Sequence, residues 1–188
     1  MNACRSTLLL YGGPPAARLK ICCCLFAAIV FCLLSGCQQE PVRGEFRLGD
    51  PAPDFAARDL DGGVVVLSSL RGKPVILRFF ETDCRFCRAD TPVITELYQK
   101  YREQGLVILY IGSFYDKESS LRAFIDELGI DFPVVMDGSA KLADLYQIKV
   151  YPQTLFISPD QRLLGALLGA VGEAEVVEIF AEHLQQVP

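Results

Sequence analysis

The sequence predicts a three-layer α/β domain with a central mixed β-sheet. Apolar runs rich in β-branched and aromatic residues alternate with stretches of helical periodicity, an order typical of parallel strands at the centre of a sheet. Two further apolar runs, separated by a turn signal near the C-terminus, predict antiparallel strands at one side. The 188 residues are enough for one domain with a hydrophobic core.

The first half of the predicted domain contains mostly strands and one long helix. Val, Ile and Phe dominate the strand candidates, and the turn signal DLDGG indicates a hairpin. The helix candidate carries Cys87, Val93 or Ile94, Leu97 and Tyr101 at helical spacing. The predicted elements are a hairpin of residues 55–58 and 64–67, buried strands over 74–80 and 106–112, and a helix over 84–104 between those strands.

The second half is predicted to alternate helices and strands before a closing helix. Gly129 is well placed to end the first of these helices, and Ser139 to cap a short one. Met136 is predicted to be a core residue of a strand. Glu173 and Glu175 suit the positive N-terminal end of the closing helix. The predicted elements are a helix over 118–128, a strand over 132–136, a short helix over 139–146, a hairpin of 154–158 and 163–168, and a helix over 173–184.

Residues 1–36 are predicted to be a secretory signal. Their only charged residues are Arg5, Arg18 and Lys20, and a 14-residue apolar run follows at 21–34. As a helix this run would rise about 21 Å, too short for a bilayer core of about 30 Å. A basic start, a short apolar run and small residues after it are typical of a signal peptide.

The cleavage site predicts a lipid anchor. The sequence LSGC at 34–37 resembles the lipobox of bacterial lipoproteins, which implies that Cys37 is lipidated and becomes the first mature residue. Each acyl CH₂ buried in a bilayer contributes about 0.8 kcal/mol, so the acyl chains would tether the protein to a membrane surface. We therefore expect a lipidated tether over 37–47 and the folded domain over 48–188.

Signal cleavage and lipidation would leave two thiols among the eight cysteines, Cys84 and Cys87. These two thiols and the single His183, far along the chain, cannot make a four-ligand zinc site, so no metal is expected within one chain. We predict His183 to be a surface or helix-end residue. Export would place the thiols where disulfides form.

The charge of the mature segment excludes one broad class of partner. It keeps 15 Lys and Arg against 23 Asp and Glu, a net charge of −8, and the acidic residues are not clustered. Nucleic-acid binding requires a basic face, so none is expected. The excess of acid indicates an ordinary soluble surface.

Cys84 and Cys87 follow a predicted buried strand and open the longest predicted helix. The unpaired N–H groups and the dipole at a helix N-terminus stabilise a thiolate, and pairs of this spacing have pKa values lowered from about 8.5 toward 7 or below. Cys87 lies one turn deeper on the same face. We therefore predict a redox pair in which Cys84 attacks and Cys87 resolves. The alternatives are a structural disulfide, whose short loop removes little chain entropy, and two buried free cysteines.

A proline at a strand start strengthens this interpretation. Pro152 lies in VYPQT just before the strand TLFIS, a place where a missing N–H is tolerated. The layout resembles the thioredoxin superfamily, in which such a proline is cis and faces the cysteine pair. The resemblance is closest to the TlpA/ResA group, also described as redoxin or AhpC/TSA-like domains, over about residues 46–185. It is carried by Pro51–Phe55, Leu70–Lys73, Cys84–Cys87, Pro92 and Pro152.

The resemblance implies both a fold and an activity. The fold is thioredoxin-like with an extra strand–helix insertion, which we place at residues 114–136. Members are exported, membrane-tethered thiol–disulfide oxidoreductases that act without a bound cofactor on protein disulfides, including those of apocytochrome c. The resemblance thus implies a site in the cell envelope, protein thiols or disulfides as partners, and an upstream electron donor that the sequence does not identify.

The resemblance also implies roles for residues around the pair. Tyr151 and cis-Pro152 would line a groove for the partner peptide, which would pair with the adjacent backbone in the manner of a strand. Arg85 and Phe86, between the two cysteines, would contact the same partner.

The sequence departs from the family pattern at three positions. Asp83 replaces the usual Trp before the first cysteine, and Phe86 replaces a frequent Pro. Asp83 opposes and Arg85 favours a thiolate at Cys84. Asp90 stands where the group has a Glu that tunes the pair. Two interpretations of Asp90 remain open: a proton acceptor for Cys87, or an exposed acid in the first turns of the helix.

Two other functions are considered. A peroxidase of the peroxiredoxin class would require a Thr three residues before the attacking cysteine, but Glu81 is there and Thr82 is one residue away. Glu81 is also a weaker candidate for a tuning acid. A non-catalytic lipoprotein could bind Cu(I) through its two thiolates, or bind a partner, although Met and His neighbours are missing. Tyr110, Phe114 and Tyr115 either border the site or pack in the core.

Overall fold

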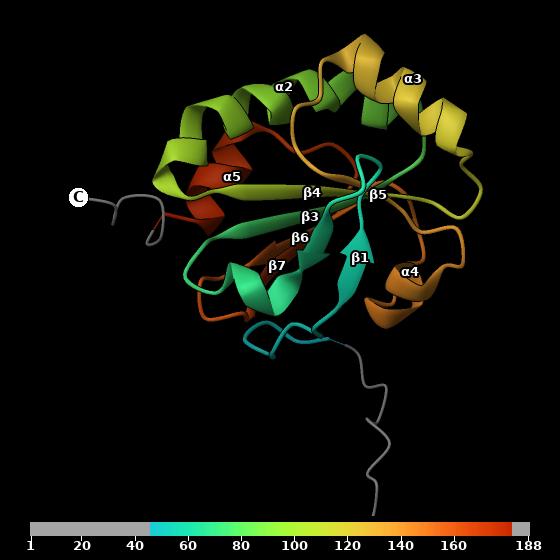
Figure 1. Ribbon diagram of the computed structural model, residues 1–188. Coiled ribbons are helices and arrows are strands. Elements are labelled where there is room, and N and C mark those ends of the chain that lie inside the picture. The colour runs from blue at the N-terminus through green and yellow to red at the C-terminus, as the bar shows by residue number, and fades with distance from the viewer. Residues whose placement is uncertain (1–45, 182–188) are drawn as a thin grey trace, which may run out of the picture. The chain divides into compact units, whose positions relative to one another are not determined.

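Five strands form a mixed sheet at the centre of the domain (Figure 1), in the order β5-β4-β3-β6-β7. The computed structural model describes residues 46–181. The signal segment 1–36, Cys37, most of the tether and His183 lie outside the described residues. The strands are β1 (Ala56–Arg58), β2 (Val64–Val66), β3 (Val75–Phe80), β4 (Val107–Gly112), β5 (Val134–Met136), β6 (Gln153–Ile157) and β7 (Leu163–Leu168). The helices are η1 (Leu67–Leu70), α2 (Arg85–Tyr101), η2 (Arg102–Gln104), α3 (Glu118–Leu128), α4 (Lys141–Leu145) and α5 (Glu173–Ile179).

Strand β3 is the middle of this sheet. It pairs in parallel with β4, Val75 opposite Val107, and antiparallel with β6, Phe79 opposite Gln153. All six β3 residues are buried, which matches the apolar run from which the strand was predicted. The one charged member of the run, Arg78, is only 1% exposed.

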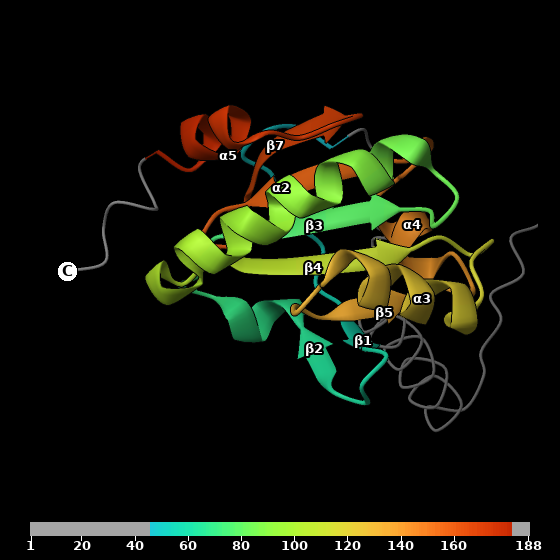
Figure 2. The same ribbon diagram turned by 90° about the horizontal axis from the view of Figure 1, so that it is seen from above.

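The alternation of side chains along β3 divides the interior into two clusters. Ile76 and Phe80 face α2, α3 and α5, whereas Val75, Leu77 and Phe79 face the opposite layer with α4 and η1. Figure 2 shows α2 and α3 in front of the strands when the domain is seen from above. The predicted three-layer architecture with a mixed sheet is therefore confirmed. No helix within residues 46–181 has the length and apolar character that crossing a bilayer requires.

Several detailed predictions are confirmed. β1 and β2 form the first hairpin, and β6 and β7 form the late one. Residues 114–136 contain the expected helix and strand, α3 and β5. Gly129 ends α3 in the left-handed conformation, with φ at 63°. The Tyr151–Pro152 peptide bond is cis.

Two predictions in the α4 region are wrong. Ser139 does not cap α4, because the helix begins at Lys141 after Ala140 in the left-handed conformation, and the Asp137 carboxylate accepts the Ala143 N–H at 2.8 Å. Met136 is not a core residue, since it ends the edge strand β5 and is 40% exposed.

Gly112 allows α3 to lie close to the end of β4. A Cβ at this position would lie 2.6 Å from Leu121 Cδ2, nearer than real contacts allow. We predict that Gly112→Ala lowers the free energy of unfolding by about 1–3 kcal/mol, measured by chemical denaturation. The same change in a Leu121→Ala background should cost less, because the clashing atoms are gone. Gly138→Ala is the control, since its added Cβ meets nothing nearer than 3.8 Å. A cost for Gly112→Ala no larger than the control's contradicts the prediction.

Candidate active site

The residues that the sequence singled out lie at one end of the central strands β3 and β6. β3 ends at Phe80, and the chain reaches Cys84 after a short turn. Because β6 runs antiparallel to β3 with Gln153 opposite Phe79, Pro152 lies opposite Phe80, at the same end of these strands. The structure thus brings the cysteine pair and the cis-proline, far apart in the sequence, to one end of the sheet.

Cys84 is the N-cap of α2. Its backbone is extended (φ −76°, ψ 113°), its carbonyl accepts the first helical N–H from Arg88 at 3.1 Å, and its Sγ accepts the Cys87 N–H at 3.4 Å. The sulfur therefore takes the place that a Ser or Asp oxygen has in an ordinary cap, at the positive end of a 17-residue helix. Cys84 is half-buried, and both cysteines are free thiols.

Cys87 lies one turn further along α2 and is 1% exposed. Burial, followed by a hydrogen bond with the Cys84 side chain, raises the pKa of the Cys87 thiol to about 12, while the guanidinium of Arg78 acts in the opposite direction. Cys84 is thus the more accessible sulfur and Cys87 the shielded one. This arrangement is the one that an attacking and a resolving cysteine require.

Arg78 is a residue that the sequence reasoning missed. It donates from Nη1 to Thr154 Oγ1 on β6 and, at 3.0 Å, to the carbonyl of Gly169. Its Nη2 forms an ion pair with Asp90 Oδ2. The signal in the sequence was a single cation inside the otherwise apolar run PVILRFF.

Asp90 is 6% exposed, so the interpretation of an exposed helix acid is wrong. Its Oδ2 accepts from Arg78 and from the Val171 N–H at 3.1 Å, while Oδ1 has no hydrogen-bond partner within residues 46–181. Burial raises the pKa of the Asp90 carboxyl, and Arg78 counteracts part of this increase. The carboxyl is therefore a buried group with one free oxygen, on the same helix as Cys87.

A second buried contact joins β4 to the cysteine helix. Thr91 Oγ1 donates to the Cys87 carbonyl at 2.6 Å and lies 3.2 Å from the Tyr110 hydroxyl. Tyr110 is fully buried, and burial raises the pKa of its hydroxyl. Of the three aromatic residues considered from the sequence, Tyr110 is thus a core residue behind the pair.

The two residues between the cysteines face solvent. The Arg85 guanidinium lies 4.6 Å from the centroid of the Phe86 ring, a cation–π contact, and Phe86 is 51% exposed. Asp83 is also exposed. Glu81 is half-buried, and burial, followed by the charge of Asp116, raises the pKa of its carboxyl. An apolar ring and a cation are thus presented beside Cys84.

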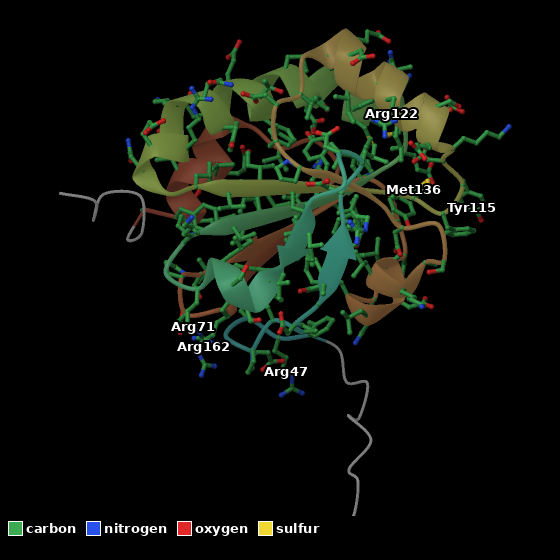
Figure 3. All side chains as sticks on the ribbon, in the orientation of Figure 1. Arg47, Arg71, Tyr115, Arg122, Met136 and Arg162 are labelled. Atoms are coloured by element: carbon green, nitrogen blue, oxygen red, sulfur yellow. The ribbon has the colours of Figure 1, made fainter. Side chains whose placement is uncertain are left out.

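A pocket of about 370 Å³ lies beside the cis-proline turn, lined among others by Glu81, Phe114, Tyr115, Lys149 and Tyr151. The rings of Phe114 and Tyr115 are 3.9 Å apart between centroids, and they are 44% and 73% exposed. Figure 3 shows Tyr115 projecting outward at the same end of the domain as Met136. These two aromatic residues line this pocket and are exposed, so they do not pack in the core, as one of the two sequence interpretations expected.

Thr82 does not offer a free hydroxyl at the site. Its Oγ1 donates to Asp116 Oδ1 at 2.6 Å, its N–H donates to the same oxygen at 3.0 Å, and it is 6% exposed. A peroxidase needs a donor aimed at the peroxide, and this hydroxyl is committed to a carboxylate. Within residues 46–181, no group of three or more His, Cys, Asp or Glu side chains could hold a metal ion.

Comparison with known proteins agrees with the geometry. The AhpC/TSA family matches residues 48–165. The thiol-disulfide oxidoreductase ResA of Oceanobacillus iheyensis is 36% identical over 158 residues, 82% of this chain and 81% of that protein. ResA of Halalkalibacterium halodurans is 32% identical over 139 residues, 74% of this chain and 78% of that protein.

A solved structure supports the fold. The thioredoxin-family thiol:disulfide interchange protein of Chlorobium tepidum aligns with a TM-score of 0.66 at 24% identity, over 75% of this chain and 99% of that one. Together with the helix-capping cysteine pair and the cis-proline, these likenesses show that the chain belongs to the AhpC/TSA family and is a thioredoxin-fold thiol–disulfide oxidoreductase of the ResA type.

Proposed function

We propose that this protein exchanges its Cys84–Cys87 pair with disulfides of partner polypeptides in the cell envelope. The observation that carries the proposal is the placement of the two sulfurs. Cys84 caps α2 and is partly accessible, while Cys87 is buried one turn on and donates its N–H to the Cys84 sulfur. The Cys84 sulfur is therefore accessible to a partner, and the Cys87 sulfur is shielded from solvent one turn away.

In the first step, the Cys84 thiolate attacks one sulfur of the partner disulfide. A mixed disulfide forms, and the other partner sulfur leaves as a thiolate. The free N–H groups and the dipole at the start of α2 stabilise the attacking anion.

In the second step, Cys87 attacks the Cys84 sulfur and releases the partner. Cys87 first has to lose its proton, and we assign Asp90 as the acceptor, because its Oδ1 is buried and free of hydrogen bonds within the described residues. Asp90 is three residues after Cys87, a spacing that places both side chains on one face of α2. An upstream reductant would then return the pair to the dithiol state.

The partner is proposed to bind across the surface beside Cys84. Arg85 and Phe86 lie next to the attacking sulfur. The turn of Tyr151 and Pro152 lies at the same end of the central strands. An extended peptide could pair with the backbone at this turn, as in other strand-addition complexes. The family likeness points to an exported protein such as an apocytochrome c.

The location is proposed from the N-terminal sequence. Residues 1–36 would be removed as a lipoprotein signal, and lipidated Cys37 with the tether 37–47 would hold the domain 48–188 at a membrane surface, facing the extracytoplasmic side.

Replacing Cys84 and replacing Cys87 should affect the reaction differently. We expect Cys84→Ser to abolish the reduction of insulin disulfides, because no accessible nucleophile remains, whereas Cys87→Ser should accumulate a mixed disulfide at Cys84. Turbidity of reduced insulin and mass spectrometry of the trapped adduct measure these two outcomes. Turnover by the Cys84→Ser protein would rule out the mechanism.

The aromatic pair beside the pocket should matter for protein partners only. Replacing both Phe114 and Tyr115 by Ala is expected to raise KM for insulin about tenfold, since removal of buried interface aromatics typically costs more than 1 kcal/mol. The rate with a small disulfide should stay within about twofold, because such a substrate does not reach this pocket. Leu48→Ala, at a 71% exposed apolar residue, is the matched control. An equal loss with both substrates would contradict a docking role.

The lipid anchor can be tested by fractionation. In bacteria that process lipoproteins, we expect the parent protein in the membrane fraction and the Cys37→Ser variant to lose both lipid labelling and membrane association, since it has no acceptor thiol at the cleavage site. Gln38→Ser keeps that thiol and is the control. A Cys37→Ser variant that stays in the membrane fraction would count against this anchor.

A further inference from the structure

We propose that Arg78 is a positioning residue for the second step of exchange, whose fixed guanidinium stabilises the negative charge on Cys87 as this sulfur attacks the mixed disulfide. The proposal rests on the roles of Cys84 and Cys87 given above. It adds a cation to a reaction otherwise described through two sulfurs and a carboxyl.

The topology places this cation beneath the cysteine helix. Along β3, Arg78 alternates with Phe79 and shares its face with Ile76 and Phe80, which pack in the cluster that contains Cys87. On α2, Cys87 and Asp90 are three residues apart and both point inward. The guanidinium therefore contacts the sheet-facing side of α2 within its first two turns, through Asp90.

The guanidinium is held in one position by acceptors from separate segments. Thr154 on β6, the carbonyl of Gly169 after β7 and the carboxylate of Asp90 on α2 each accept from it. With 1% of the residue exposed, water neither screens the charge nor competes for its N–H groups. A charge fixed in a medium of low polarity acts strongly on a neighbouring anion.

The charge balance around Cys87 explains why a cation is useful. With Cys87 as a thiol, Arg78 and Asp90 neutralise each other. When the proton moves from Cys87 to Oδ1 of Asp90, the negative charge moves from the carboxyl to the sulfur, and the same guanidinium now faces the new anion. Burial raises the pKa of Cys87 to about 12, and Arg78 acts against this increase. The other titratable groups around Cys87 are Cys84 at the helix cap and Tyr110 on β4, and a hydrogen bond from the Glu81 backbone also favours the thiolate.

The chemistry balances without an added reagent. In the mixed disulfide, Cys87 loses its proton to Asp90 and its sulfur attacks the sulfur of Cys84. The Cys84–Cys87 bond forms, the bond from Cys84 to the partner breaks, and the partner leaves as a thiolate that takes up a proton. The partner disulfide has gained two electrons, and the Cys84–Cys87 pair has lost them.

A small aromatic disulfide separates the two steps. When reduced protein reacts with dithiobis(nitrobenzoate), one coloured thiolate leaves as Cys84 forms the mixed disulfide, and a second leaves as Cys87 resolves it. Stopped-flow absorbance at several pH values therefore gives a rate and a pH profile for each cysteine. The informative comparison is Asp90→Asn against Arg78→Gln/Asp90→Asn, because both lack the acid and only one keeps the cation.

We expect the second phase of Arg78→Gln/Asp90→Asn to be at least about tenfold slower than that of Asp90→Asn at neutral pH, with its pH profile displaced upward by about one unit or more. The first phase should differ by less than about threefold. Arg78→Lys, which keeps the charge, should keep the second phase close to that of the parent protein. Circular dichroism confirms folding, and if Asp90→Asn alone does not fold, Arg78→Lys/Asp90→Asn replaces it.

Equal second phases with equal pH profiles in the two compared variants would overturn the proposal, since a residue that only supports packing does not move the ionisation of Cys87. A result that contradicts the Cys84–Cys87 exchange mechanism itself would be distinguishable from this one. It would appear as a first phase that survives Cys84→Ser, whatever residue occupies position 78.

Discussion

The buried ion pair between Arg78 and Asp90 ties the central strand to the helix that carries both cysteines. The same two side chains also bind Thr154 on β6, the Gly169 carbonyl and the Val171 N–H. Removing one member would leave an uncompensated buried charge, at a cost of about 3–5 kcal/mol, although replacing both by apolar residues of similar size can be neutral. The pair therefore contributes to the arrangement of these segments more surely than to net stability.

This arrangement explains how one domain holds an apolar interior and a reactive site at the same place. The cluster between the sheet and α2 contains Ile76, Phe80, Ile94 and other apolar residues, and Cys87 is one of its members. A thiol in such surroundings is inert unless a charge lies close enough to favour its anion. The polar groups beneath Cys87 supply that charge without opening the core to water.

The fold could be predicted because its signals are local. Apolar runs without polar alternation, Gly129 after an amphipathic stretch, and a proline before a strand each act within a few residues. The predicted elements are present with shifts of a few residues at their ends, except that the closing helix, predicted over 173–184, ends at Ile179, and residues 182–184 lie outside the described residues. Capping by Asp137 depends on where α4 begins, and the exposure of Met136 depends on which strand is at the edge of the sheet; neither was visible from the sequence.

The site could be predicted only in part, for the same reason. The two cysteines are three positions apart in the sequence, and their place after a predicted strand was sufficient to predict a redox pair. The partners of Arg78 lie 12, 76 and 91 residues away, so no local pattern could show that its charge is satisfied in the core. Without those partners, Asp90 could equally be read as a surface acid, and the pairing of the two charges removes that ambiguity.

The Cys84 sulfur both caps α2 and takes part in disulfide exchange, and it caps the helix better in one oxidation state than in the other. As a thiolate, Cys84 is a charged acceptor for the Cys87 N–H, whereas in a disulfide the same atom is neutral and a poor acceptor. Oxidation therefore weakens the cap of the helix at the moment when the partner leaves. The oxidised and reduced forms therefore differ in how firmly the first turn of α2 is capped, and not only in the bond between the two sulfurs.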